Sequence, residues 1–244
     1  FFLQPLAQVG QFGFEKADIT DAASVRNAVK SATAVVNLCG VFGKAMHRVH
    51  VEGARNVAEA ARDSGAGSLV QVSAIAASLE SQSSYGRTKG EGEKAVRDAF
   101  PSATIIRPSL VFGPEDDLTN RFAAMANMPV LPVIAAKRNF QPVYVRDLAK
   151  AIALAALQPD RFGAKTYEIG GPQVMSMVEL HHAILELTGQ KPEIVHTPDF
   201  VTGLIARLGF LPGAPLTQDQ WMMLQRDNVT SGELPGLEAF GIEP

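Results

Sequence analysis

The sequence predicts an α/β fold, in which a doubly wound parallel sheet is followed by a small, mostly helical cap. Short apolar runs typical of buried strands alternate with helical periodicity through the first 160 residues or so. Beyond Gly170, helix signals follow one another with few such runs between them. The chain has 244 residues, of which 46% are hydrophobic and 19% charged, so it is long and apolar enough to bury a core.

The elements of the sheet follow in a regular order. A helix is expected after Asp21 because Val25, Ala28 and Val29 recur at helical spacing. The apolar runs 34–38 and 68–74 are typical of strands buried on both faces. In chain order, the patterns predict a strand at 14–19, the helix after Asp21, a strand at 34–38, a helix over 46–61, a strand at 68–74, a helix over 85–100, strands at 103–107 and 141–145, a helix beginning near Asp147, and a strand at 166–169.

The predicted cap begins with a capping box. Ser176 and Glu179 are expected to start a helix that Gly189 ends, and further helices are expected over 200–208 and after Thr217. The apolar face of residues 200–210 has two interpretations, because it suits packing inside the cap or docking on a partner or a membrane surface. The acidic residues 115–117 indicate a helix start rather than a cation site.

Composition and charge exclude several classes of protein. With 22 basic and 25 acidic residues the net charge is −3, and no basic block is present, so no nucleic-acid partner is expected. No apolar run approaches the roughly 20 residues of a transmembrane helix. The five histidines show no metal-ligand spacing, so no metal site is expected. The single cysteine, Cys39, stands in an apolar run and is expected to be a buried residue of a protein from a reducing, cytoplasmic compartment.

Tyr85 and Lys89 form the sharpest chemical signal. Their spacing of four residues places them on one face of the predicted helix, about 6 Å apart. An ammonium beside a phenol favours the phenolate, which lowers the pKa of the tyrosine. Such a tyrosine can exchange a proton with a hydroxyl or carbonyl group while a hydride moves at carbon. A tyrosine–lysine pair on an ordinary surface helix is the plainer interpretation of the same spacing.

The ends of the predicted strands favour the functional interpretation. Ser73 ends one buried strand, and residues 37–40 end its neighbour with a glycine that permits close approach of a ligand. Residues 18–19 and 107–109 end two further strands. Ligands of open α/β sheets bind at the carboxyl ends of the strands, so these residues are expected to share one site with Tyr85 and Lys89.

These motifs resemble the short-chain dehydrogenase/reductase superfamily, in its extended or atypical branch. The matching stretches lie at 18–21, 36–40, 50–56, 72–74, 85–89, 107–114 and 143–147. Residues 92–101, 112–122, 141–145 and 234–237 are also similar to a narrower group, the NAD(P)H-binding accessory subunit of respiratory complex I and its bacterial epimerase/dehydratase-like relatives. The resemblance implies a Rossmann-like sheet and a nicotinamide dinucleotide, NAD or NADP, as the cofactor.

The resemblance also implies roles for individual residues. Tyr85 would act as the acid/base and would hold the nicotinamide ribose together with Lys89, while Ser73 would share the substrate oxygen with Tyr85. The acid of Asp18 would reach the adenine amino group, and Ile19 would cover the ring. The catalytic set is therefore Tyr85, Lys89 and Ser73, and the cofactor-binding set is Asp18, Ile19, Leu38, Cys39, Gly40, Val72, Tyr85, Lys89, Pro108, Ser109 and Leu110.

The sequence departs from the family pattern before Asp18. The glycine-rich loop that receives the pyrophosphate normally follows the first strand, whereas Gly10 and Gly13 precede the first predicted strand and are expected to form a turn. The first β-α-β unit is therefore missing from the 244 residues, and we expect it to be an omitted part of a longer chain, since a sheet without it would expose strand edges. Residues 1–170 are expected to form the nucleotide-binding domain, and residues 171–244 the cap packed on it.

Two functions are consistent with these motifs. The first is an NAD(P)(H)-binding protein similar to the complex I accessory subunit, with the nucleotide as a structural or sensing ligand and a membrane respiratory complex as partner. Such a protein would be cytoplasmic, at the inner face of a respiratory membrane. The second is an active oxidoreductase, epimerase or dehydratase that uses Tyr85, Lys89 and Ser73 on a sugar nucleotide or a small carbonyl compound.

Overall fold

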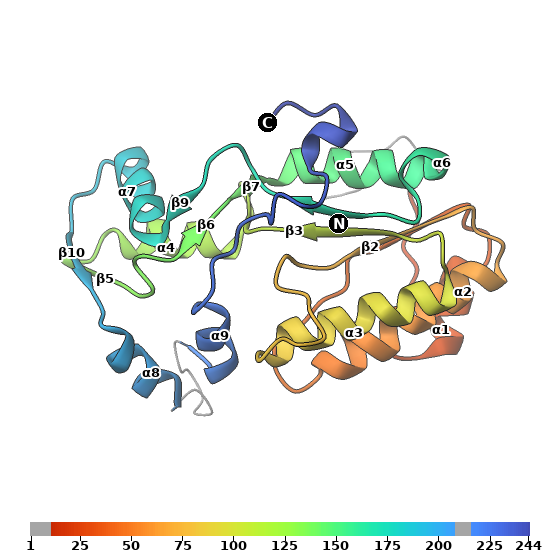
Figure 1. Ribbon diagram of the computed structural model, residues 1–244, viewed down its shortest axis with the longest axis horizontal. Helices are drawn as coiled ribbons and strands as arrows, with labels where there is room; N and C mark the ends of the chain where they lie inside the picture. Colours follow the sequence, from red (N-terminus) through yellow and green to blue (C-terminus); the bar gives the residue numbers. More distant parts are fainter. Residues whose placement is uncertain (1–10, 208–215) are drawn as a thin grey trace.

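A four-stranded parallel sheet forms the centre of the protein. The computed structural model describes residues 11–207 and 216–244. The strand order is β1-β2-β3-β8, and all three pairings are parallel. Helices cover both faces of this sheet (Figure 1), so the predicted doubly wound architecture is confirmed. The strands are β1 (Ala34–Asn37), β2 (Ser68–Val72), β3 (Thr104–Pro108) and β8 (Thr166–Ile169).

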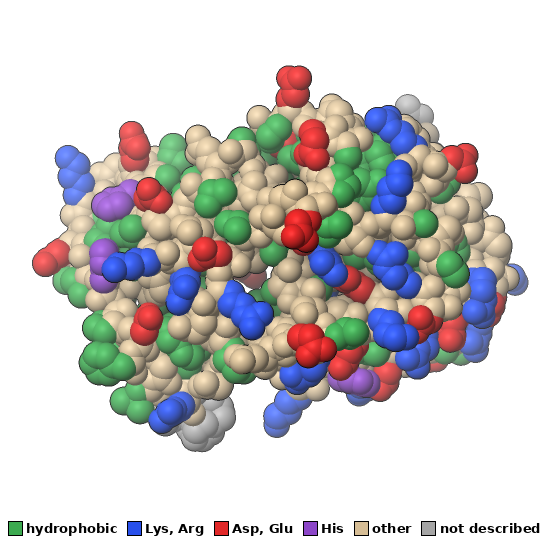
Figure 2. Space-filling model, viewed as in Figure 1, with side chains coloured by type: hydrophobic (Ala, Val, Ile, Leu, Met, Phe, Trp, Pro, Cys, Tyr) green, Lys and Arg blue, Asp and Glu red, His purple; other side chains and the backbone are tan. Residues whose placement is uncertain are grey.

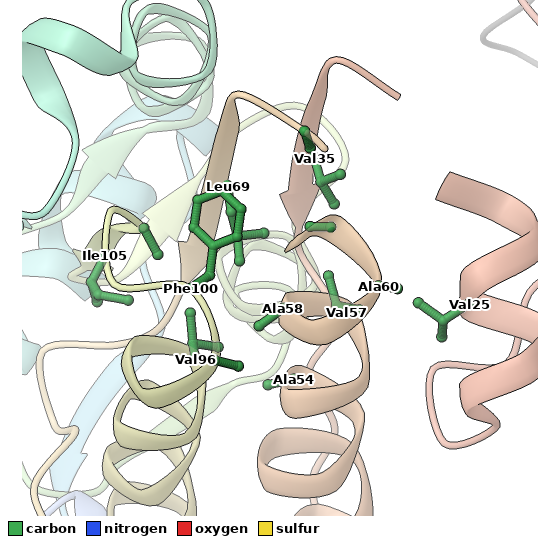
Figure 3. Packing of buried hydrophobic residues seen from close by; sticks show 14 residues of the cluster. Val25, Val35, Ala54, Val57, Ala58, Ala60, Leu69, Val96, Phe100 and Ile105 are labelled. Carbon is green, nitrogen blue, oxygen red and sulfur yellow. The ribbon is translucent and has the colours of Figure 1, made fainter. Parts of the chain in front are cut away.

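One helical layer comes from the first hundred residues. It consists of α1 (Ala22–Val29), the π-helical segment η2 (Arg48–Gly53), α2 (Ala54–Asp63) and α3 (Ser84–Ala99). Figure 3 shows how apolar side chains of these helices meet Leu69 and Ile105 of the sheet. Val57 and Val96 point into this cluster from two of the helices. Burying each large side chain stabilises the fold by roughly 1.5–3 kcal/mol, which holds α3 against the sheet.

The opposite face is covered by helices from later in the chain. They are α5 (Val145–Leu157), the short α6 (Pro159–Phe162) and the 3₁₀ turn η3 (Leu237–Phe240). Phe240 stacks on Phe162 with the ring centroids 4.5 Å apart, and Tyr167 of β8 joins them. The last residues of the chain therefore return from the cap to the central sheet, as Figure 1 shows.

The cap contains short strands as well as the predicted helices. A core around Leu131, Phe140 and Leu180 draws on residues from 110 to 140, residues from 175 to 194 and Leu224, and the division of the chain at residue 170 stays a prediction. The helices are α4 (Asp117–Met125), α7 (Met177–Thr188), α8 (Asp199–Arg207) and α9 (Gln218–Met223). The strand pairs are β4 (Val111–Phe112) with β7 (Val143–Tyr144), β5 (Val130–Val133) with β10 (Glu193–His196), and β6 (Asn139–Phe140) with β9 (Met175–Ser176).

Local capping signals are confirmed. The Ser176 side chain accepts from the Glu179 N–H, and the Glu179 carboxylate accepts from the Ser176 N–H, so the capping box is complete. Gly189 ends α7 with a positive φ of 69°. Asp116 caps α4 by accepting from the Thr119 N–H, as expected for the acidic helix start. Gly10 and residues 208–210, which carried other predictions, lie outside the described residues.

Three expectations for the first strands are wrong. Residues 14–19 form no strand, because within the described ranges β1 is an edge strand and nothing pairs with its free side. For the same reason β1 is not buried on both faces, and Val36 is 38% exposed. Cys39 is exposed rather than buried, because it follows the end of β1.

Candidate functional site

The helix α3 carries Tyr85 and Lys89 to the carboxyl end of β2. It begins after Ser83, whose hydroxyl accepts from the Gly86 N–H and caps the first turn. The Lys89 ammonium is buried and donates to the carbonyl oxygen of Val72 at 3.4 Å. It lies 5.9 Å from the centroid of the Tyr85 ring. The pair predicted from the sequence is therefore formed, next to the strand that Val72 ends.

The predicted lowering of the Tyr85 pKa is wrong. Burial raises the pKa of the Tyr85 phenol, because the phenolate would lose its hydration. Burial also lowers the pKa of Lys89, while the charges of Glu93 and Cys39 act in the opposite direction. The ammonium donates to the Val72 carbonyl oxygen, and desolvation sets the direction of the pKa shift of the phenol. Both groups are thus held closer to their neutral forms than the sequence suggested.

His50 is a further residue of the site, and its role was not predicted from the sequence. It lies in η2, and π-helical turns of this kind are often found at functional sites. The residue is only 3% exposed. The Val41 N–H donates to Nε2 at 3.1 Å, so Nε2 carries no proton. Nδ1 must then donate to the Thr88 hydroxyl, 2.9 Å away, which itself donates to the Ser84 carbonyl oxygen at 2.8 Å. His50 therefore links the loop after β1 to α3.

Burial keeps His50 neutral. Desolvation is the main cause that lowers its pKa to about 4, and the nearby Lys89 ammonium acts in the same direction. The sequence shows this histidine in the stretch that resembles the family, but only the fold brings it to Thr88. Neither ring nitrogen is free, so His50 positions other groups and is not poised to relay a proton.

The loop after β1 lies against Lys89 and Tyr85. A Cβ atom placed on Gly40 would lie 3.3 Å from the Lys89 Nζ, a tight contact, and 3.8 Å from the His50 Nε2, so the backbone at Gly40 closely approaches both side chains. Phe42 stacks on Tyr85 with the ring centroids 4.8 Å apart and the planes inclined by 20°. The His50 ring meets Tyr85 edge-on at 5.5 Å. Phe42 thus covers one face of the tyrosine ring.

Ser73 provides a buried hydroxyl that the protein does not use. The residue is 4% exposed, and its Oγ has no hydrogen-bond partner within the described ranges. Its backbone N–H donates to the Ile106 carbonyl oxygen at 2.7 Å, which fixes the residue beside β3. A buried polar atom without a partner costs roughly 1–3 kcal/mol, so Ser73 fits a ligand oxygen or amide at this place.

The other predicted strand-end residues have different environments. The Ser109 hydroxyl donates to the backbone and side-chain oxygens of Asn228, at 2.8 and 2.7 Å, and is occupied by the C-terminal segment. The Pro108 carbonyl oxygen accepts from the Ile75 N–H at 3.2 Å. Leu110 packs against the core of the cap, while Leu38 is 66% exposed at the end of β1.

Asp18 and Ile19 lie on the side of α1 and η2. The Asp18 carboxylate accepts from the backbone and hydroxyl of Thr20, which holds its pKa below the usual value. Ile19 packs on Gly53, where an added Cβ would lie 2.9 Å from its side chain. The structure therefore brings together Gly40, Val72, Tyr85 and Lys89 with the unpredicted His50, and the roles of Asp18 and Ile19 at an adenine stay predictions.

Neither a metal-ligand cluster nor a large cavity marks the position of Tyr85 and Lys89 within the described ranges. Within the described ranges, no three histidine, cysteine, aspartate or glutamate side chains are arranged to hold a metal ion. A cavity of about 330 Å³ opens beside the end of β8, lined among others by Gln141, Glu168, Gly170 and Thr230. It does not include Tyr85 or Lys89, so the chemistry of the site rests on the cluster around α3 and not on this cavity.

The surface combines charges of both signs with an apolar area on the cap. Figure 2 shows acidic and basic side chains interspersed over the sheet domain, and hydrophobic side chains both at the cap end and over the upper part of the sheet domain. On α8, Phe200 is 79% and Leu204 62% exposed, whereas Thr202 and Ala206 are buried. This helix therefore uses one face for the cap core and leaves apolar residues exposed on another. No helix of the described part is long and apolar enough to cross a membrane.

Comparisons with known proteins agree with this geometry. Residues 7–202 match the family model described as RmlD substrate binding domain. The chain is 35% identical over 250 residues to NADH dehydrogenase (ubiquinone) 1 alpha subcomplex subunit 9, mitochondrial, of Rattus norvegicus. That alignment takes in 99% of this chain but only 66% of the rat protein, so the chain spans slightly less than two thirds of its length.

A bacterial enzyme and a solved structure are also similar. The ceramide reductase of Caulobacter vibrioides is 31% identical over 187 residues, which cover 75% of this chain and 58% of that protein. The crystal structure of Thermus thermophilus UDP-glucose 4-epimerase in complex with NAD has a TM-score of 0.69 at 20% identity. It covers 99% of this chain and 82% of the epimerase chain, and it confirms the Rossmann-like fold.

Proposed function

Because this chain belongs to the RmlD substrate binding domain family, we propose that it is an NAD(P)(H)-binding protein of the short-chain-dehydrogenase type. The nucleotide would serve mainly as a structural or sensing ligand. The observation that carries the proposal is the meeting of Gly40, Tyr85 and Lys89 at the carboxyl ends of β1 and β2. The similarity to a subunit of the rat NADH dehydrogenase (ubiquinone) supports a role for the chain as part of a respiratory complex.

The residues of the site fit one end of a nicotinamide dinucleotide. Tyr85 and Lys89 would hold the hydroxyls of the nicotinamide ribose, and Gly40 leaves space for the nucleotide next to the backbone. The Ser73 hydroxyl is free to meet a ligand oxygen or amide. A bound dinucleotide supplies a hydride acceptor or donor. By the family resemblance, Asp18 and Ile19 would lie at the adenine, Leu38, Cys39 and Val72 would line the nucleotide, and Pro108, Ser109 and Leu110 would border the nicotinamide.

Three features favour sensing over turnover. Phe42 covers a face of Tyr85, burial raises the pKa of the phenol, and both nitrogens of His50 are engaged in structural hydrogen bonds. A tyrosine that must exchange protons near neutral pH needs the opposite influence on its pKa. This environment instead suits a site in which the nucleotide stays bound and its binding changes the position of the surrounding helices.

A direct test compares binding and turnover. Isothermal titration with NAD, NADH, NADP and NADPH should give a dissociation constant for at least one of them, and Lys89→Met should weaken that binding about tenfold or more, since a charge-assisted contact is lost. Asp98→Asn is the matched control, because Asp98 lies on the outer side of the same helix and pairs with Lys94. No binding by the full chain would refute the proposal, as would turnover that Tyr85→Phe abolishes.

The proposed partner is a membrane respiratory complex, with the protein attached at the inner face of the membrane from the cytoplasmic side. This extends to the present chain the membership in NADH dehydrogenase (ubiquinone) that the name of the rat relative states. The expected result is copurification of a tagged chain with an NADH:quinone oxidoreductase after mild detergent extraction. Recovery of the whole protein without any membrane subunit, under conditions that keep the complex intact, would contradict the partnership.

The second candidate is an active NAD(P)-dependent oxidoreductase, epimerase or dehydratase. The unpartnered hydroxyl of Ser73, the residue that follows Val72 at the end of β2, favours it, and so does the similarity to a ceramide reductase. Nucleotide oxidation or reduction would be followed at 340 nm with sugar nucleotides and small carbonyl compounds. Turnover reduced about a hundredfold or more in both Ser73→Ala and Tyr85→Phe would establish this candidate and displace the sensing function.

A further inference from the structure

A carboxylate of the cap is bound to the first turn of α3. Asp219, in α9, accepts hydrogen bonds from the backbone N–H groups of Ser84 and Tyr85, the latter at 3.1 Å. The residues are separated by more than 130 positions along the chain. Figure 1 shows α9 beside the end of α3 where that helix begins. This contact joins the cap directly to the turn that carries Tyr85.

The first turn of α3 requires such an acceptor. The first four N–H groups of a helix have no partner within the helix, and its N-terminus attracts negative charge. The side chain of Ser83 accepts from the Gly86 N–H, and Arg87 already makes the first helical bond, to the Ser83 carbonyl oxygen. The N–H of Ser84 donates to Oδ1 of Asp219, and the N–H of Tyr85 donates to Oδ2. The cap therefore completes the capping of α3.

Asp219 is itself held firmly by α9. This helix has a complete capping box, in which Thr217 accepts from the Gln220 N–H and Gln220 accepts from the Thr217 N–H. Two residues beyond Asp219, the buried Trp221 packs in a small core with Ala206 and Leu216. A displacement of the cap core would thus move the Asp219 carboxylate, and with it the backbone of Tyr85.

We propose that Asp219 is a positioning residue that couples the cap to the nucleotide site. Through its two hydrogen bonds, the place of α9 sets the place of the Tyr85 backbone, and a ligand that contacts Tyr85 is sensed in α9. The effect on the ligand response rests on the proposed nucleotide binding, whereas the coupling of α9 to α3 exists without a ligand. Trp221 is the only tryptophan of the chain and reports on α9 directly.

The first experiment measures amide hydrogen exchange in the full chain without nucleotide. In Asp219→Ala, exchange at Ser84 and Tyr85 should accelerate at least about tenfold, because bonds to a charged acceptor are lost. Exchange at Gly86 should change little, since Ser83 still holds it. Ser83→Ala should give the reverse pattern, with faster exchange at Gly86. If exchange at Ser84 and Tyr85 stays within twofold of the wild type, the coupling does not exist.

The second experiment follows the emission of Trp221 while NAD or NADP is added, because the oxidised nucleotides do not absorb in the range of tryptophan emission. The wild type should respond to the nucleotide that binds, and Asp219→Ala should lose most of that response while still binding. Asp227→Ala is the matched control, because Asp227 accepts two hydrogen bonds from Asn139 within the cap and should leave the response unchanged. An unchanged response in Asp219→Ala would reduce Asp219 to a helix cap and overturn the proposal.

The two experiments distinguish a failure of the proposed nucleotide binding from a failure of the coupling between α9 and α3. If the wild type binds no nucleotide, the proposed function fails, while the exchange data still decide whether Asp219 couples α9 to α3. If Asp219→Ala does not fold, Asp219→Asn replaces it, because the amide keeps one acceptor oxygen. Asp219→Asn should then accelerate exchange at one of the two amides and retain part of the Trp221 response, and wild-type values in both measurements would refute the coupling.

Discussion

Gly92→Ala should destabilise the protein, because α3 and η2 touch at this residue. A Cβ atom at position 92 would lie 2.1 Å from the carbonyl oxygen of His50. An ordinary contact for a Cβ begins at 3.4 Å, so the two segments would have to separate by about 3.4 − 2.1 = 1.3 Å. Backbone atoms form this contact, and no rotamer change can relieve it.

Two opposing effects set the magnitude. Replacing glycine by alanine within a helix contributes about 1 kcal/mol of stability through the backbone. Overpacking a buried interface costs typically about 1–3 kcal/mol, and the backbone contact places Gly92→Ala at the upper end. The net loss is therefore about 1–2 kcal/mol of unfolding free energy, which lowers the Tm by roughly 2–8 °C for a chain of this size.

Urea unfolding and thermal melting measure this loss, with Gly67→Ala as the matched control. A Cβ at Gly67 would lie 3.7 Å from the Thr33 carbonyl oxygen, an ordinary contact, so Gly67→Ala should be close to neutral. Gly92→Ala should also weaken nucleotide binding, because Lys89 lies one turn away on the displaced helix. A Gly92→Ala protein as stable as the wild type would refute the close contact of α3 with η2.

Three further predictions concern buried charge, pH and a helix end. Arg107→Met should cost about 3–5 kcal/mol in urea unfolding, because it leaves the buried carboxylates of Glu93 and Glu168 unpaired, and a smaller loss in the double variant with Glu93→Gln would confirm the pairing. The pKa of His50 is about 4 in the fold and near 6.5 in the unfolded chain. Below pH 6.5 the unfolded chain takes up the proton first, so about 3 kcal/mol of the free energy of unfolding is lost as the pH falls to 4. His50→Asn should flatten that part of the stability profile, and an unchanged slope would contradict the neutral histidine. Gly189→Ala should lower the free energy of unfolding by about 1–2 kcal/mol, because Gly189 has a φ of 69°, and a neutral effect would contradict the left-handed end of α7.

Features that depend only on residues close together in the sequence could be predicted. The capping box of Ser176 and Glu179 was found because its two partners are three residues apart. The i and i+4 spacing of Tyr85 and Lys89 placed both on α3, and the apolar run before Ser73 located the carboxyl end of β2. These signals depend on helix and strand periodicity alone, so no knowledge of the rest of the fold is needed.

Features that depend on distant neighbours could not be predicted. Residues 14–19 have the pattern of a strand, but a strand also requires a partner for its backbone groups. The pKa of Tyr85 depends on how deeply α3 is buried, which the spacing to Lys89 does not contain. His50 and Thr88 are 38 residues apart, and β5 pairs with β10 across about 60 residues, so neither contact has a local signal.

The polar contacts of α3 explain why its position is so closely determined. Asp219 of the cap holds its first turn, His50 of η2 holds Thr88, and Arg107 of β3 holds Glu93 with two hydrogen bonds of 2.9 and 2.7 Å. These three partners come from separate parts of the chain. Because Lys89 stands between the second and third contacts, its backbone cannot shift toward a ligand without straining at least one of them. A nucleotide bound there must accept this geometry or shift α3 as a unit, and a shift of the whole helix is transmitted to α9 through Asp219.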